Sequence, residues 1–172
     1  MFSVIGGKLT THRSLAEEAV DRIQESIGRR SPSLTASAPL PGGAGIAVES
    51  FKRSLATQAG ELALSVDRLV RIYGANAPAI LDLALATSDL ARIFDEASGA
   101  LAAEVVYAVE HEGAVSMEDI LMRRTMVGLG PDLGIGADEA ASKIAVARLG
   151  WSDARAAAEV AAYRHHIQRF KV

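Results

Sequence analysis

The sequence predicts a mainly α-helical fold, and three observations support this prediction. Alanine and leucine are abundant, whereas aromatic residues make up only 5% of the 172 positions. Apolar residues recur at helical spacing, every three or four positions, through most of the chain beyond residue 46. Runs of the β-branched residues that favour strands are few. Because 49% of the residues are hydrophobic, the chain can bury a substantial core.

The N-terminal stretch differs from this helical pattern. Residues 2–5 are expected to form a short strand, because two β-branched residues lead into the Gly6-Gly7 pair, which permits a tight turn. A helix is then expected from about Thr11 to Ile27. An isolated strand is unstable, so we infer that this one belongs to a sheet outside the chain. Without that sheet, we expect residues 1–10 to be disordered or to pair non-natively.

A strand that leads through glycines into a helix can form an anion-binding site. The first N–H groups of a helix lack internal partners, and the helix dipole places partial positive charge there. Lys8 adds a full positive charge. The stretch is not a Walker A loop, because Leu9 follows the lysine where Ser or Thr is required. An ordinary strand-to-helix turn without a ligand is the alternative interpretation.

The remainder of the chain is expected to be a linker followed by a helical domain. Residues 29–45 are rich in proline, glycine and small polar residues, which is typical of a linker. Helices are expected over about 48–62, 66–73, 78–85, 102–112, 116–125, 137–149 and 152–170. Residues 88–101 and 128–136 are expected to be irregular. Leu90, Ile93 and Phe94 are expected to enter the core from residues 88–101, and Trp151 is expected to anchor the break at Gly150 between the two final helices.

No arrangement of residues indicates a metal centre or a nucleophilic catalyst. The chain has no cysteine, and His111-Glu112 lacks the second histidine of a His-Glu-x-x-His motif. His165 and His166 are sequence neighbours, which places them about 100° apart around a helix and makes them poor ligands for one ion. We therefore expect no metal and assign no catalytic residue within this chain.

Residues 102–125 have the outline of a helix-turn-helix, a motif that binds DNA. The base-reading positions would include Glu118 and Asp119, whose carboxylates would face phosphates. The net charge of −3 gives no strong attraction to nucleic acid or anionic lipid. No apolar run approaches the ~20 residues of a membrane span. We predict no nucleic-acid binding, and an independent helical DNA- or protein-binding module is the alternative function.

Arg123, Arg124 and Thr125 form one polar cluster that looks exposed. The two cations are candidates for docking, either as an anion clamp or against a neighbouring domain. The alternative interpretation is that they complement the dipole at a helix C-terminus.

Several segments resemble FAD-dependent glycerol-3-phosphate dehydrogenases. Residues 4–13, Val-Ile-Gly-Gly-Lys-Leu-Thr-Thr-His-Arg, are similar to the end of the flavin domain in that family. Later similar segments occur in the family's order: Arg-Ile-Tyr-Gly at 71–74, Ala-Glu-Val-Val-Tyr-Ala-Val at 103–109, Glu-Asp-Ile-Leu-Met-Arg-Arg-Thr at 118–125, Leu-Gly-Trp at 149–151 and Ala-Glu-Val-Ala-Ala-Tyr at 158–163. The resemblance covers nearly the whole chain and is weakest in the linker and in 87–100.

The resemblance implies an organisation and an activity. In that family the intact enzyme oxidises glycerol 3-phosphate to dihydroxyacetone phosphate and passes electrons through FAD to quinone. The family's Gly-x-Gly-x-x-Gly fingerprint is absent here. The chain is therefore expected to be a C-terminal portion: residues 1–28 the last strand and helix of an incomplete FAD-binding domain, 29–45 a linker, and 46–172 a multi-helical cap domain with a structural or interaction role. The chain alone is expected to bind no FAD and to be inactive.

The resemblance also implies a site, partners and a location. The residues expected to contact FAD are Gly6, Gly7, Lys8, Leu9 and Thr10, and Lys8 is also expected to bind the substrate. A helix N-terminus with a lysine would stabilise the negative charge of reduced flavin. Expected partners are the missing N-terminal FAD domain of the same chain, glycerol 3-phosphate and quinone, and a homo-oligomer is left open. The intact enzyme is expected to be cytoplasmic and peripheral at the membrane.

Overall fold

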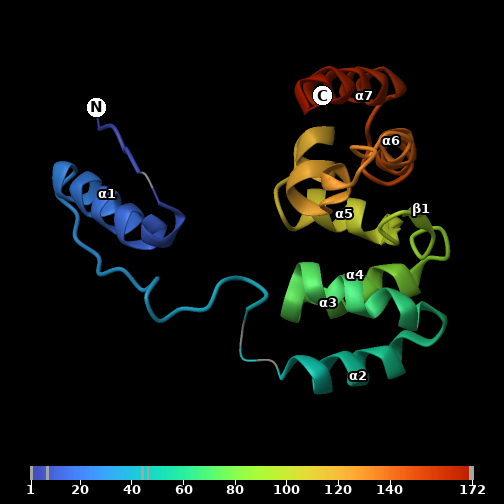
Figure 1. Ribbon diagram of the computed structural model, residues 1–172, viewed down its shortest axis with the longest axis horizontal. Helices are drawn as coiled ribbons and strands as arrows, with labels where there is room; N and C mark the ends of the chain where they lie inside the picture. Colours follow the sequence, from blue (N-terminus) through green and yellow to red (C-terminus); the bar gives the residue numbers. More distant parts are fainter. Residues whose placement is uncertain (1, 7, 44, 46, 171–172) are drawn as a thin grey trace. The chain divides into compact units, whose positions relative to one another are not determined.

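The computed structural model describes residues 2–6, 8–43, 45 and 47–170, and 64% of the chain is helical (Figure 1). The prediction of a mainly α-helical chain is therefore confirmed. The chain divides into two compact units, residues 1–44 and 45–172, which are described separately below. Gly7, one of the residues expected to contact FAD, lies outside the described residues.

The first unit is built around one helix, α1 (His12–Ser26), which a 3-10 turn at Leu9–Thr11 precedes. Residues 2–6 are extended and exposed, and they form no strand with any residue that the structure describes. Gly28 follows the helix with φ +68°, the left-handed conformation that glycine adopts without strain. No residue of α1 is buried. The unit therefore has no hydrophobic core of its own.

The first half of the second unit contains four helices that pack in chain order, the first against the second, the second against the third and the third against the fourth. These are α2 (Val48–Ala59), α3 (Val66–Tyr73), α4 (Ala77–Ala86) and α5 (Ala102–Glu110). The helix expected over 48–62 ends at Ala59, because the chain turns at Gly60; it turns again at Gly74, where the helix expected over 66–73 ends. Both glycines have positive φ, and Pro78 lies in the first turn of α4. The core of this half includes Leu69 and Ile80, both at 0% exposure.

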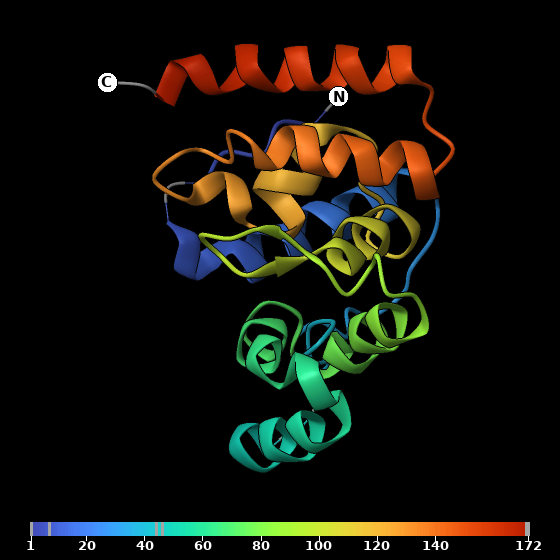
Figure 2. The same cartoon turned by 90° about the vertical axis from the view of Figure 1, so that its right-hand side faces the viewer.

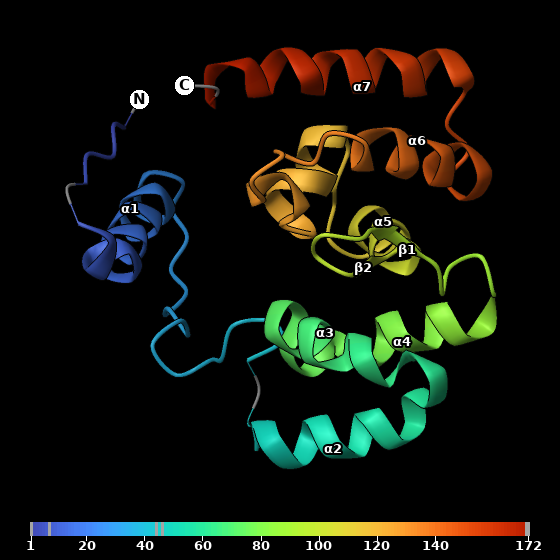
Figure 3. The same ribbon diagram turned by 45° about the vertical axis from the view of Figure 1, so that its right-hand side comes forward.

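The second half packs α5 against the C-terminal elements. These are a π-helix (Asp119–Arg124), a 3-10 turn (Val127–Leu129), α6 (Ala137–Arg148), α7 (Asp153–Ile167) and a final 3-10 turn (Gln168–Phe170). Helix α5 separates the two cores, because Ala103 and Val106 face the first while Val105 and Ala108 face the second. Trp151 is buried, as expected of an anchor. Figures 2 and 3 show α7 running alongside α6.

The connection at residues 88–101 is more regular than the sequence predicted. Strand β1 (Ile93–Asp95) pairs antiparallel with β2 (Ala100–Leu101). Leu90 is buried as expected, but Ile93 is 44% exposed, so its predicted place in the core was wrong. The side chain of Asp95 points inward instead, where it accepts hydrogen bonds from the N–H and hydroxyl of Ser98 and closes the turn.

One helical stretch also bears on membrane association. By length and composition alone, residues Val48–Ala86 could cross a membrane. In the fold this stretch comprises α2, α3 and α4, which bend at Gly60 and Gly74 and supply the first core. Of its most apolar 18-residue segment, 39% is buried in the fold, so helix packing accounts for part of its apolar character.

Candidate functional site

The turn that precedes α1 is the first candidate site. Lys8 has extended backbone angles and caps the 3-10 turn. Its carbonyl accepts hydrogen bonds from the Thr11 amide at 3.3 Å and from the Thr11 hydroxyl at 3.0 Å. His12 contacts the Leu9 carbonyl through Nδ1 at 2.7 Å. These bonds hold the chain in the helix-entry conformation, at the end of a helix where the first N–H groups lack partners within the helix.

The donors at this turn are available to a ligand. Lys8, Leu9 and Thr10 are all exposed, and the Lys8 ammonium and Thr10 hydroxyl hydrogen-bond to none of the residues that the structure describes. A cation and a hydroxyl beside a helix N-terminus suit an anionic group. The geometry is thus compatible with the predicted anion site, and the cofactor and substrate roles of these residues stay predictions.

The packing against α1 requires a glycine at position 6, independently of the predicted contact of Gly6 with a cofactor. A Cβ atom at this position would lie 2.7 Å from Cδ2 of Leu15 on α1. The extended residues 2–6 therefore return along α1, and the pocket between them is lined by both segments. An extended segment followed by a helix that packs back on it has the order of the first two elements of a βαβ unit.

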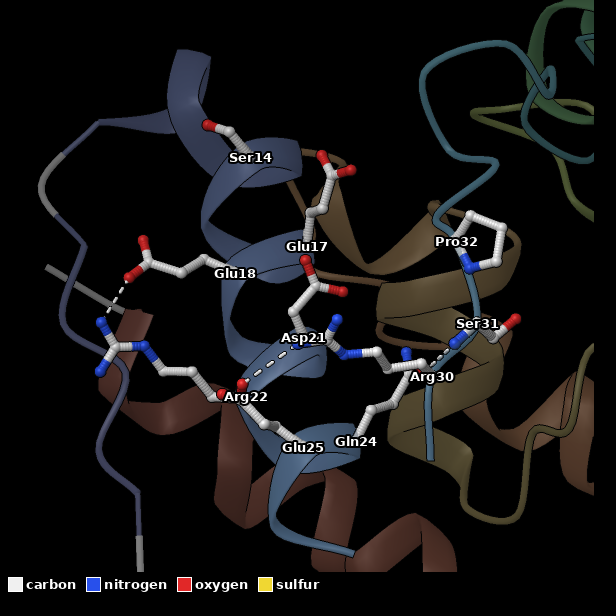
Figure 4. Close-up of a pocket in the computed structure, with 10 residues that line it drawn as sticks. All are labelled: Ser14, Glu17, Glu18, Asp21, Arg22, Gln24, Glu25, Arg30, Ser31 and Pro32. Atoms are coloured by element: carbon white, nitrogen blue, oxygen red, sulfur yellow. Dashed lines mark hydrogen bonds and ion pairs between the residues drawn. The ribbon is translucent and has the colours of Figure 1, made fainter. Parts of the chain in front are cut away.

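A hollow along the other flank of α1 is rich in carboxylates (Figure 4). Most of them are already paired: Glu18 accepts from Arg22 at 2.8 Å, and Glu25 from Arg30 at 3.5 Å. Among the described residues, no group of three or more His, Asp or Glu side chains could hold a metal ion. This flank is a solvated, ion-paired helix surface, and such pairs contribute little stability.

The Arg123-Arg124-Thr125 cluster is less exposed than the sequence suggested. Thr125 is fully buried, and its hydroxyl donates to the Ile120 carbonyl at 2.9 Å. Arg123 pairs with Glu118 and with Asp119, the latter at 2.6 Å. Arg124 donates from Nε to the Glu112 carbonyl at 2.9 Å. The hydrogen bonds of Arg123, first of all the one to Asp119, raise its pKa above the usual value of an arginine. The two arginines stay docking candidates, whereas Thr125 is a structural residue.

A buried polar network that the sequence interpretation missed joins the two cores. Arg68 on α3 donates to both carboxylate oxygens of Glu104 on α5, at 3.1 and 3.0 Å. The same guanidinium donates to the Thr125 carbonyl at 2.6 Å, and Tyr73 donates to Glu104 at 2.8 Å. Burial and the neighbouring carboxylate raise the pKa of Tyr73, so it stays a donor. A lone glutamate within the apolar run 100–109 was the sequence feature that could have revealed it.

Two further contacts attach α7 to the domain. Arg164 donates to Asp138 at 2.5 and 3.1 Å, and the Asp138 side chain is fully enclosed. Burial raises the pKa of Asp138, but the hydrogen bonds from Arg164 and from the N–H groups of Glu139 and Gly136 outweigh it, so the pKa lies below 3.8. The Tyr163 hydroxyl donates to the Leu133 carbonyl at 2.7 Å, and burial raises its pKa to about 12. These contacts serve packing.

Comparison with known proteins decides the family. The family model for the C-terminal domain of alpha-glycerophosphate oxidase matches residues 33–156, which is more than half of the chain. The chain belongs to this family. The resemblance inferred from the sequence is therefore confirmed. Residues 1–32, which include α1 and the Lys8 turn, precede the matched segment.

Curated relatives of this family member are longer proteins named glycerol-3-phosphate dehydrogenase. The protein of Pseudomonas aeruginosa is 41% identical over 134 residues, which cover 75% of this chain and 25% of the relative. That of Mycobacterium leprae is 33% identical over 171 residues, covering 98% and 29%. The aerobic enzyme of Escherichia coli is 35% identical over 134 residues, covering 75% and 26%. The chain thus spans about a quarter to a third of the relatives' length. No solved structure matches it.

Proposed function

We propose that this chain is the C-terminal portion of an FAD-dependent enzyme that oxidises glycerol 3-phosphate to dihydroxyacetone phosphate. The observation that carries the proposal is the family match, together with relatives named glycerol-3-phosphate dehydrogenase that extend well beyond this chain. Electrons would pass from FAD to quinone, at the cytoplasmic face of the membrane. The alternative, an independent DNA- or protein-binding module, has less support because the matched relatives carry an enzyme's name.

The domain organisation supports this proposal. The first unit has a strand-like segment and a helix but buries no residue of α1. Val20 and Ile23 on α1 and Ile27 at its C-cap form an apolar stripe, and they are 50%, 46% and 60% exposed. An amphipathic helix obtains its stability by burying such a stripe. We therefore propose that residues 1–28 complete a flavin-binding domain, that 29–45 are a linker, and that 46–172 are the cap domain.

The Lys8 turn would hold part of the cofactor. FAD supplies a hydride acceptor when it is bound. The residues of this chain would contribute binding and electrostatics: the first amides of the turn and Lys8 would face an anionic group, and Thr10 would donate a hydroxyl. Lys8 is long enough to face the substrate oxygen or phosphate as well. Gly6 keeps the backbone close to α1, since a side chain there would meet Leu15.

The proposal is tested first on the isolated chain. We expect the purified protein to retain no FAD and to reduce no dye with glycerol 3-phosphate, because the dinucleotide fingerprint is absent from its sequence. The measurements are flavin absorbance of the purified protein and dye reduction with substrate and added FAD. Retained flavin together with dye reduction would show that the chain is active alone. This result would contradict the proposal that FAD binding and catalysis require an upstream FAD-binding domain.

The docking role of the cap is a separate proposal. Arg124 and Arg123 lie at the end of the π-helix, where they would contact a neighbouring domain or subunit. Co-expression of this chain with the upstream part of the Mycobacterium leprae relative, followed by affinity capture, measures the association. Arg124→Ala is expected to lower the captured fraction, with Arg53→Ala on α2 as the control. Equal capture of the two variants would show that Arg124 does not contribute to docking.

A further inference from the structure

The groove between the β1–β2 hairpin and α6 is a second concave site, unrelated to the Lys8 turn. Its volume is about 380 Å³. One wall is the β1–β2 hairpin, whose strand β1 packs against α6 (Figure 1). Backbone hydrogen bonds fix this wall, from Ala102 N–H to the Arg92 carbonyl at 2.8 Å and from Ala103 N–H to the Leu90 carbonyl at 3.0 Å. The other wall is α6 along nearly its whole length.

Apolar side chains from both walls line the groove. Leu90 and Phe94 come from the hairpin segment, and Ile144 and two alanines, Ala140 and Ala147, come from α6. Ile93, the first residue of β1, also lines the groove and is 44% exposed. A large apolar side chain that is partly exposed leaves apolar surface in water, which an apolar ligand in the groove would cover.

The charges at the rim of the groove are unbalanced. Arg148 is paired with Asp89, with Nε 3.0 Å from Oδ2, and Glu139 is paired with Arg164 at 2.7 Å. Arg92 and Lys143, in contrast, make no ion pair or side-chain hydrogen bond with any residue in the described ranges. The hydrogen bond from Arg148 lowers the pKa of Asp89, and the charge of Arg92 adds to this effect. Two cations therefore remain beside an apolar floor, on a chain whose net charge is −3. An anionic group fits this rim by charge complementarity.

We propose that this groove binds a small amphiphilic carboxylate, whose apolar body lies on Phe94 and Ile144 and whose anionic group lies between Arg92 and Lys143. The volume falls within the range of small-molecule sites, which are roughly 300–1,000 Å³ and mostly apolar with a few placed polar groups. The carboxylate would gain two ion pairs, and the body would cover the exposed part of Ile93. This site does not depend on the flavin proposal, because its residues all lie in the helical domain.

The test uses octanoate as the probe and 1-octanol as its neutral analogue of equal chain length. Isoleucine methyl NMR of the whole chain reports on Ile93 and Ile144, which both line the groove. We expect octanoate to shift these two methyl signals saturably and octanol to bind more weakly. Replacing both cations, in R92Q/K143Q, is expected to weaken octanoate binding by about two- to fivefold per cation, the range of exposed ion pairs. R53Q, which changes an exposed arginine on α2, is the matched control.

Three results would overturn the proposal. These are equal affinity for octanol and octanoate, unchanged octanoate affinity in R92Q/K143Q, or shifts confined to methyl groups outside the groove. Because both replaced side chains are exposed, the variants are expected to keep the wild-type methyl spectrum without ligand. A second variant, Ala147→Phe, should fill the groove and abolish octanoate binding without changing its charge. Persistent binding in Ala147→Phe would also contradict the assignment.

Discussion

Arg68 and Glu104 form a two-pronged ion pair in the interior of the helical domain, with contacts of 3.1 and 3.0 Å. The Glu104 side chain is completely enclosed, and that of Arg68 is 14% exposed. Glu104 also accepts the N–H of Leu101 at 2.9 Å, so α5 begins at the point where α3 is attached. Arg68 reaches the Thr125 carbonyl as well. One pair thus joins α3, α5 and the end of the π-helix across both cores.

Glu104→Ala should destabilise the domain severely. The change leaves the Arg68 guanidinium, the Tyr73 hydroxyl and the Leu101 amide without their shared acceptor. Removing one partner of a buried pair costs about 3–5 kcal/mol of unfolding free energy. Urea unfolding followed by circular dichroism measures the loss. Arg123→Ala, which removes the pairs of a half-exposed arginine with Glu118 and Asp119, is the control and should cost less, about 1 kcal/mol or below. Equal losses in the two variants would contradict the role of the pair.

The attachment of α7 should depend on pH through Asp138. Its pKa in the folded chain is below the ordinary 3.8, so the stability that it contributes is present above about pH 3.8 and is lost as the pH falls through the lowered value. Asp138→Asn should therefore lower the melting temperature at pH 7. The difference from wild type should become smaller below about pH 3.8, where Asp138 itself becomes protonated. Asp82→Asn, on the exposed face of α4, is the control. A constant difference between wild type and Asp138→Asn at every pH would count against this linkage.

Gly128 should be intolerant of a side chain for a reason that involves Tyr163. A Cβ at this position would lie 2.5 Å from the Tyr163 hydroxyl and would also collide with the sulfur of Met122. Gly128→Ala is expected to cost about 1–3 kcal/mol in unfolding free energy, as overpacked cores do. The same change in a Tyr163→Phe background should cost less, because the hydroxyl is absent. A double-mutant cycle in urea measures the coupling, and additive effects would refute the steric explanation.

The sequence predicted the helices well because their evidence is local. Gly74 and Pro78 mark the helix end and start that the structure shows, whereas the helix expected over 48–62 ends earlier, at Gly60. The small hairpin was missed because its strands comprise only three and two residues, and its first strand places Ile93 outward. The Arg68–Glu104 pair was missed because its partners are far apart in sequence, and helical periodicity carries no information on which faces meet. The groove beside α6 depends on the same long-range packing.

The N-terminal turn shows the complementary case. Its glycines and Lys8 were recognised from sequence alone, and the structure adds the contact of Gly6 with Leu15. The turn's ligand cannot be inferred from the packing of this unit, because the unit buries none of α1. The function proposed for the turn therefore depends on the flavin-binding domain that we propose packs against α1.

The most direct test of the central claim is flavin reduction in a chimaera. The chain replaces the corresponding C-terminal part of the Mycobacterium leprae relative, whose match covers 98% of this chain and so includes the Lys8 turn. Anaerobic stopped-flow absorbance then follows flavin reduction after glycerol 3-phosphate is added. We expect reduction in the chimaera, and reduction slowed at least about tenfold by Lys8→Ala, equivalent to about 1.4 kcal/mol of transition-state stabilisation. Wild-type reduction kinetics in a correctly folded Lys8→Ala chimaera would contradict the assignment of this turn to the flavin site.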